Sequence, residues 1–262
     1  MNPGEMPAGL FLLKLVVTPL LIAVATLVAR RWGHGVGGWL AGFPLTSAPV
    51  SIFLAIEQGP AFAARAAVGT LLGLAAMGIA CLAYGMVARH AGWVASTAAT
   101  FVAFVIAAAA LRHVTDSLPL AFLLVCATLA AVALALPRTS HGGAPATAPA
   151  WDLPARMVAA TGVVLILTTA AAHLGPTLSG LLSPFPVFLL VLAIFAQRTE
   201  SADASIRVLR GGVIGSFAFA IFFLIVGAGL VRLGLGPTYA IASAGTIAVN
   251  GAVLSLGRRT LR

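Results

Sequence analysis

Long apolar stretches recur from one end of the chain to the other, separated by short polar segments. Each is about 20 residues long, the length that a helix needs to cross the hydrocarbon core of a bilayer. The polar and apolar residues do not alternate over short segments, as they do in membrane β-barrels. We therefore predict nine membrane-spanning helices, at residues 8–30, 36–57, 61–88, 93–112, 117–136, 155–174, 178–197, 204–232 and 236–256.

The composition supports an all-α, polytopic membrane protein, since 61% of the 262 residues are hydrophobic and only 8% are charged. The net charge of +9 does not indicate a nucleic-acid partner, because the basic residues stand singly or in pairs between apolar stretches. We expect the partners to be the lipid bilayer and a small solute, with the protein either a monomer or a homodimer. Cys81 and Cys126 stand alone in apolar stretches and match no metal-ligand spacing, so we predict neither a metal nor a cofactor.

The basic residues also predict how the chain is oriented. With nine spans, eleven Lys and Arg fall on the side of the C-terminus and four on the other side. Positive charge collects in cytoplasmic loops, so we place the N-terminus outside and the C-terminus in the cytoplasm. The start has Glu5 and no basic n-region, so we expect the first apolar stretch to stay in the protein. The Arg-rich, Ala-rich composition is typical of a GC-rich bacterial genome, which makes the bacterial inner membrane the predicted location.

An internal repeat appears when the sequence is shifted by 142 residues. The shift carries Phe43 and Pro44 onto Phe185 and Pro186, and Lys14 onto Arg156. It also carries an R-x3-G-x3-G motif onto a second copy of itself: Arg65, Gly69 and Gly73 onto Arg207, Gly211 and Gly215. The register holds for about 60 residues and matches rare residue types, so we interpret spans 1–4 and 6–9 as two copies of one unit.

The fifth span determines how the two copies are related. Four helices bring the chain back to its starting side, and a fifth crosses before the second copy begins, which inverts that copy. Inverted repeats of this kind are a transporter architecture. We therefore predict repeat 1 at 1–112, a crossing helix with a flexible linker at 113–153, and repeat 2 at 154–262.

Prolines near the centres of spans 2 and 7 predict broken helices. Pro44 and Pro49 interrupt the first copy, and Pro184 and Pro186 interrupt the second. Proline removes a backbone donor, and broken helices persist in a membrane only when they pack against protein or line a wet cavity. Thr46 and Ser47 are polar groups near the first break that suit a cavity. The alternative is a packing kink without function.

The R-x3-G-x3-G motif places its three residues on one face of a helix. We predict that Gly69, Gly73, Gly211 and Gly215 allow close helix packing. For Arg65 and Arg207 two interpretations stay open. They are either arginines that snorkel to the membrane interface or cations at the two mouths of a central pathway, a reading that extends to Lys14 and Arg156.

Chemistry that is missing narrows the function. The six acidic residues all fall at span ends or in loops, which argues against a proton-coupled cation exchanger and favours an anionic, zwitterionic or neutral solute. The sequence contains no H-E-x-x-H motif, no nucleophile elbow and no phosphate-binding glycine loop. We therefore predict that the protein is not an enzyme.

The stretch LSGLLSPFPVFLLVLAIFAQRTESADASIRVLRGG, at 178–212, resembles the GlpM family of small bacterial inner-membrane proteins. The shared pattern is a glycine, a Phe-Pro pair in an apolar run and a later arginine. It falls on Gly180, Phe185, Pro186 and Arg207, and in the first copy on Gly38, Phe43, Pro44 and Arg65. The family's members are single four-helix units, so the resemblance implies two such units fused around an extra helix.

These predictions converge on a secondary transporter for a small solute, with its pathway between the repeats. The predicted lining residues are Phe43, Pro44, Thr46, Ser47, Phe185 and Pro186, with Arg65, Arg207, Lys14 and Arg156 to attract or gate the solute. Two alternatives stay open. One is a non-transporting subunit or assembly partner of an envelope complex, and the other is a translocator of lipids or lipid-linked sugars.

Overall fold

The structure is a computed structural model that describes residues 8–41, 43–44, 47–139, 151–159, 161–162 and 184–257. Throughout these ranges the regular structure is helical, with no β-strand. In chain order the helices are α1 (Ala8–Trp32), α2 (His34–Ala41), α3 (Ser47–Glu57), α4 (Pro60–Val87), α5 (Trp93–Leu111), α6 (Leu118–Ala135), α9 (Val187–Thr199), α10 (Ala202–Leu233) and α11 (Leu235–Gly257). Residues 152–159 form a further short helical segment.

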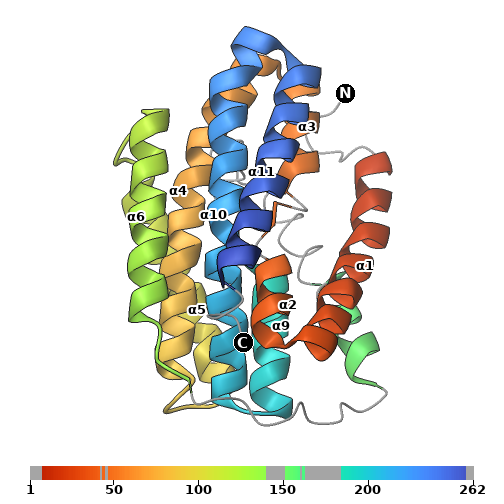
Figure 1. The fold of residues 1–262 in the computed structure, drawn as a ribbon, viewed down its shortest axis with the longest axis vertical. Coiled ribbons are helices and arrows are strands. Elements are labelled where there is room, and N and C mark those ends of the chain that lie inside the picture. The colour runs from red at the N-terminus through yellow and green to blue at the C-terminus, as the bar shows by residue number, and fades with distance from the viewer. Residues whose placement is uncertain are drawn as a thin grey trace.

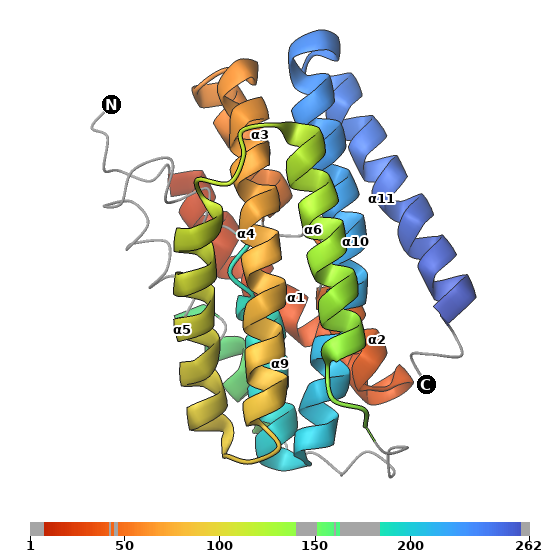
Figure 2. The ribbon, with the colours of Figure 1, turned by 90° about the vertical axis from the view of Figure 1, so that its left-hand side faces the viewer.

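Helix α10 is the centre of the bundle (Figure 1). It contacts α2, α4, α6, α9 and α11, and α5 packs on the far side of α4 (Figure 2). The fully buried side chains that form this core are mostly Ala, Val, Leu and Phe from α4, α9 and α10. The core therefore brings together elements that are far apart in the sequence.

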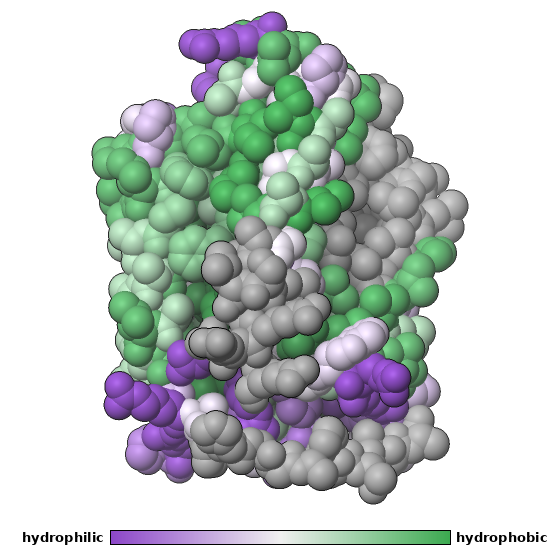
Figure 3. Space-filling view, in the orientation of Figure 1, coloured by the Kyte–Doolittle hydropathy of each residue, from purple (hydrophilic) through white to green (hydrophobic). Residues whose placement is uncertain are grey.

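Four of the described helices are long and apolar enough to cross a membrane, namely α4, α5, α6 and α10. The most apolar windows of α4 and α10 are 67% and 61% buried, whereas those of α5 and α6 are only 28% and 22% buried. Apolar residues thus cover the outside of α5 and α6, where a soluble protein would carry polar ones. In Figure 3 an apolar belt separates hydrophilic residues at the two ends of the molecule, as a bilayer requires. The chain is a helical, membrane-embedded protein.

Helices α4 and α10, which carry the two copies of the R-x3-G-x3-G motif, run in opposite directions along the bundle (Figures 1 and 2). At one end, Gln197 in α9 donates hydrogen bonds to the carbonyl oxygens of Ala88 and Ala91, just after α4 ends. Asp203, in the first turn of α10, lies at the same end, with its Oδ1 atom 3.9 Å from Nη2 of Arg89. The C-terminus of α4 therefore lies beside the N-terminus of α10.

Tight glycine turns connect two of the helix pairs. Gly33, between α1 and α2, has φ of +97°, and Gly234, between α10 and α11, has φ of +76°. Residues with a Cβ rarely adopt these angles, so glycine is the residue that lets one helix end and the next begin at once.

Several predictions lie outside the described residues. Thr46 and the side chain of Lys14 belong there, as do most of the predicted sixth span, the first part of the seventh and most of the linker at 137–152.

Candidate functional site

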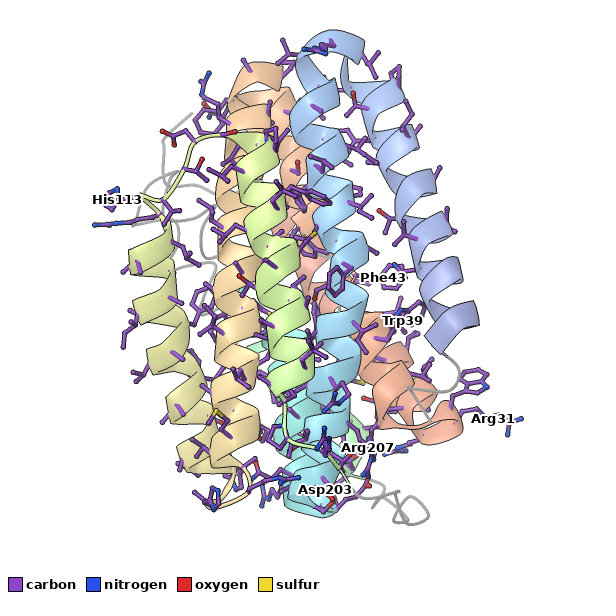
Figure 4. All side chains as sticks on the ribbon, turned by 60° about the vertical axis from the view of Figure 1, so that its left-hand side comes forward. Arg31, Trp39, Phe43, His113, Asp203 and Arg207 are labelled. Carbon is purple, nitrogen blue, oxygen red and sulfur yellow. The ribbon has the colours of Figure 1, made fainter. Side chains whose placement is uncertain are left out.

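The first proline break lies between α2 and α3. Helix α2 ends at Ala41 and α3 begins at Ser47, with Pro44 buried between them. The carbonyl oxygen of Pro44 accepts a hydrogen bond from Ala48 N at 2.9 Å, which starts α3. The ring of Trp39, in the last turn of α2, meets the ring of Phe43 edge-on at 5.1 Å (Figure 4). This contact holds Phe43 at the break.

The corresponding prolines of the predicted second copy precede α9. Pro186 is the N-cap of this helix, and its carbonyl oxygen accepts a hydrogen bond from Leu190 N at 2.7 Å. A proline at this position costs no hydrogen bond, because the first N–H groups of a helix have no partner within it. Phe185 is buried against α5, where it stacks on Phe101 at 4.8 Å and meets Phe104 edge-on at 5.0 Å.

The break between α2 and α3 and the proline segment before α9 meet at one cavity in the bundle. Phe43 and Ser47 line it from the α2–α3 break, and the Pro184–Leu189 segment lines it from the start of α9. Helix α4 contributes Leu74 and Met77, and α10 contributes Ser216 and Phe219. Its volume of about 40 Å³ holds a few water-sized molecules, well below the several hundred Å³ of a drug-sized pocket.

Four predicted pathway residues, Phe43, Ser47, Phe185 and Pro186, thus line the same cavity. Pro44 is buried at the same break. Sequence reasoning missed Ser216 and Phe219, which follow the glycine motif on α10, and Met77 on α4. Their signal was their position, one to four residues beyond the last glycine of each motif.

Arg65 and Arg207 do not line this cavity. Arg65 is exposed in the second turn of α4. Arg207 is half-buried in the second turn of α10, at the same end as Asp203 (Figure 4). Because α4 and α10 are antiparallel, the two arginines lie at opposite ends of the bundle.

Arg156 belongs to a buried ion-pair cluster. Its Nε donates to Asp152 Oδ2 at 2.9 Å, and Arg30 of α1 donates to the same oxygen at 2.8 Å. Asp152 is fully buried and Arg156 is 5% exposed. The guanidinium of Arg156 also lies 4.9 Å from the centre of the Phe195 ring, a cation–π contact.

This cluster joins α1 to the 152–159 segment and to α9. A second ion pair lies near Arg30 in the sequence. His34 Nε2 of α2 lies 2.7 Å from Oε2 of Glu200, which is in the turn between α9 and α10. Sequence reasoning placed Asp152, with the other acidic residues, at span ends or in loops, and missed its burial. The available signal was its i, i+4 spacing to Arg156, which suits a helical ion pair.

The two glycine motifs have different surroundings among the described residues. A Cβ at Gly211 would overlap with the carbonyl oxygen of Gly35, and one at Gly215 with that of Trp39, so α10 and α2 touch backbone to backbone. A Cβ at Gly69 would meet no described atom within 4 Å. Gly73 is buried in α4.

No family model, no curated protein and no solved structure matches the chain. The resemblance to the GlpM family therefore stays a prediction. Across the described ranges, no three His, Cys, Asp or Glu side chains gather as a metal site would require. The site that the geometry defines is the cavity between the α2–α3 break and the start of α9.

Proposed function

We propose that the protein is an inner-membrane secondary transporter for a small solute, with its pathway through the cavity at the two proline breaks. The observation that carries the proposal is that residues from both copies, Phe43 and Ser47 from one and Phe185 and Pro186 from the other, line one cavity. Transporters of inverted-repeat type place their binding site at such a meeting of discontinuous helices.

The antiparallel arrangement of α4 and α10 supports the inverted repeat that this proposal needs. These helices carry the same motif and meet in the core. Nine spans and an external N-terminus complete the proposed topology, in which basic residues collect on the cytoplasmic side. A fused pair of GlpM-like units is the corresponding evolutionary hypothesis.

Flux into proteoliposomes tests the proposal. The purified protein is reconstituted, and uptake is measured for a panel of neutral, zwitterionic, anionic and cationic small solutes. We expect at least one solute to cross at about 10 or more times the rate in protein-free vesicles, a rate that the lipid alone does not give.

The variant Ser47→Leu fills the cavity from the start of α3, and we expect it to abolish that flux. Thr97→Leu is the control, because Thr97 lies on α5 and does not line the cavity. Both variants are checked for monodispersity and thermal stability before flux is measured. Absence of flux for every solute, or full flux through the Ser47 variant, contradicts the proposal.

A further inference from the structure

The lining of the cavity carries information on the charge of the solute. Its described lining residues are Phe, Pro, Ala, Val, Leu, Met and Ser, and none of them is ionisable. The sequence around them agrees, since residues 35–56 and 174–197 contain no Asp, Glu, Lys, Arg or His. An ion that entered this cavity would find no counter-charge among these residues.

Transferring such an ion from water into the cavity would have a large desolvation free energy. Taking a charge out of water into an apolar site has a large free-energy cost unless a partner compensates the charge. Arg156, which is buried, does not offer that partner, because it is already paired with Asp152. Arg65 and Arg207 do not line the cavity. An anionic solute would thus lose its hydration without gaining a cation.

Ser216 contributes a hydroxyl group, with a known number of hydrogen-bond donors and acceptors, to the lining of the cavity. Its hydroxyl donates to the carbonyl oxygen of Gly212 at 2.7 Å, and the side chain is fully buried. A hydroxyl has one donor and two acceptor lone pairs. With its proton directed to Gly212, Ser216 Oγ is suited to accept a hydrogen bond from a solute, while Phe43, Phe185 and Phe219 contact its apolar part.

We infer that the solute is a small, uncharged molecule that carries a hydroxyl or amide N–H donor. This inference rests on the transport function proposed above. Ser216 accepts the hydrogen bond of that donor, and the phenylalanine rings replace the water around the rest of the molecule. The charged residues at the two ends of the bundle stabilise the fold and its orientation and do not bind the solute.

The test compares probes of different charge in the same proteoliposomes. Glycerol, urea and acetamide are the neutral probes, followed by stopped-flow light scattering. Phosphate, succinate and choline are the charged probes, followed with radiolabel. We expect at least one neutral probe to cross 10 or more times faster than in protein-free vesicles and all three charged probes to stay within about twofold of those vesicles, as the cost of burying a charge requires.

Two serine variants test the hydrogen bond. Ser216→Ala removes the acceptor, and we expect it to lower flux of the transported neutral probe about five- to tenfold, a typical effect of leaving one buried donor unpaired. Ser205→Ala is the matched control, because Ser205 is also fully buried on α10, also donates to a backbone carbonyl of its own helix at 2.7 Å, and does not line the cavity. Its flux should equal that of the unaltered protein.

The outcomes separate the two proposals. Flux of phosphate, succinate or choline that Ser47→Leu blocks overturns the inference of a neutral solute and leaves transport intact. Neutral flux that Ser216→Ala and Ser205→Ala change equally overturns the role of Ser216. No flux of any probe overturns the transporter itself, and the solute inference falls with it.

Discussion

Asp152 and Arg156 form an ion pair inside the protein, with Arg156 Nε 2.9 Å from Asp152 Oδ2 and both side chains buried. Arg30, whose side chain is 38% exposed, donates to the same oxygen. The carboxylate therefore serves two cations, of which only Arg30 has access to water. Asp152 therefore links α1 to the 152–159 segment at the end of the bundle where they meet.

Removing the charge of Asp152 should destabilise the protein strongly. Asp152→Asn leaves Arg156 as a buried cation without a counter-ion, and the loss of one partner of a buried pair costs about 3–5 kcal/mol. We expect a clearly lower melting temperature in detergent. Asp152→Asn combined with Arg156→Met should recover much of that loss, and Asp116→Asn, at an exposed position, should change nothing. A double variant as unstable as Asp152→Asn alone would refute the account.

The backbone contact between α2 and α10 predicts different responses from the two glycine motifs. Gly211→Ala should push α10 away from Gly35 and destabilise the protein by about 1–3 kcal/mol, the usual cost of overpacking. In the matched change Gly69→Ala the new Cβ meets no described atom within 4 Å, so the change should be neutral or slightly stabilising, since alanine favours helix. Thermal unfolding in detergent compares the two. Equal melting temperatures would mean that the contact of α2 with α10 does not constrain the helices.

Arg210 caps the end of α6 from the neighbouring helix. It donates to the carbonyl oxygens of Ala133, Leu136 and Pro137 at 2.8, 2.9 and 3.2 Å. These carbonyls have no partner within α6, so Arg210→Leu should lose about 1.5–3 kcal/mol and let the last turn of α6 fray. Hydrogen exchange should become faster at 132–136. Arg112→Gln, an exposed change at the end of α5, is the control and should leave that exchange unaltered.

A hydrogen bond joins α3 to α11. The hydroxyl groups of Ser51 and Tyr239 are 2.8 Å apart. Tyr239→Phe should cost about 0.5–1.5 kcal/mol, and a cycle with Ser51→Ala should assign that cost to the pair. Tyr84→Phe is the comparison, because the Tyr84 hydroxyl is buried with no hydrogen-bond partner in the described structure, so its removal should be neutral or stabilising. A larger loss at Tyr84 than at Tyr239 would contradict this assignment.

Cysteine labelling tests the proposed orientation. His90 and His113 are exposed in the connections after α4 and after α5, and His113 lies at the opposite end of the bundle from Arg207 (Figure 4). In a background with Cys81→Ala and Cys126→Ala, an impermeant maleimide added to intact cells should label His113→Cys and spare His90→Cys until the cells are lysed. The reverse pattern would mean that the orientation is opposite to the proposed one. Labelling of both in intact cells would mean that the connections after α4 and after α5 do not lie on opposite sides of the membrane.

Much of the fold follows from local sequence. The predicted stretches at 61–88, 93–112 and 204–232 correspond to α4, α5 and α10 within two residues, because helix ends in an apolar chain coincide with glycine, proline or charge. The break near Pro44 was also predictable, since proline acts on its own turn. The contacts of Phe43 with Trp39 and of Phe185 with α5 were not, because they depend on which helix faces which.

The sequence by itself determined the length of the apolar segments at α4, α5 and α10, the break at Pro44 and the repeated arginine–glycine motif. These are properties of a residue and its near neighbours, since a helix in hydrocarbon must satisfy its own backbone. Only the tertiary structure decided that Phe43 and Phe185 line one cavity, that Ser216 lines it too, that Gly211 has a close neighbour where Gly69 has none among the described residues, and that Asp152 is buried with Arg156. Those outcomes depend on close packing between segments far apart in the chain, and apolar helices of similar composition do not encode their partners in a local pattern.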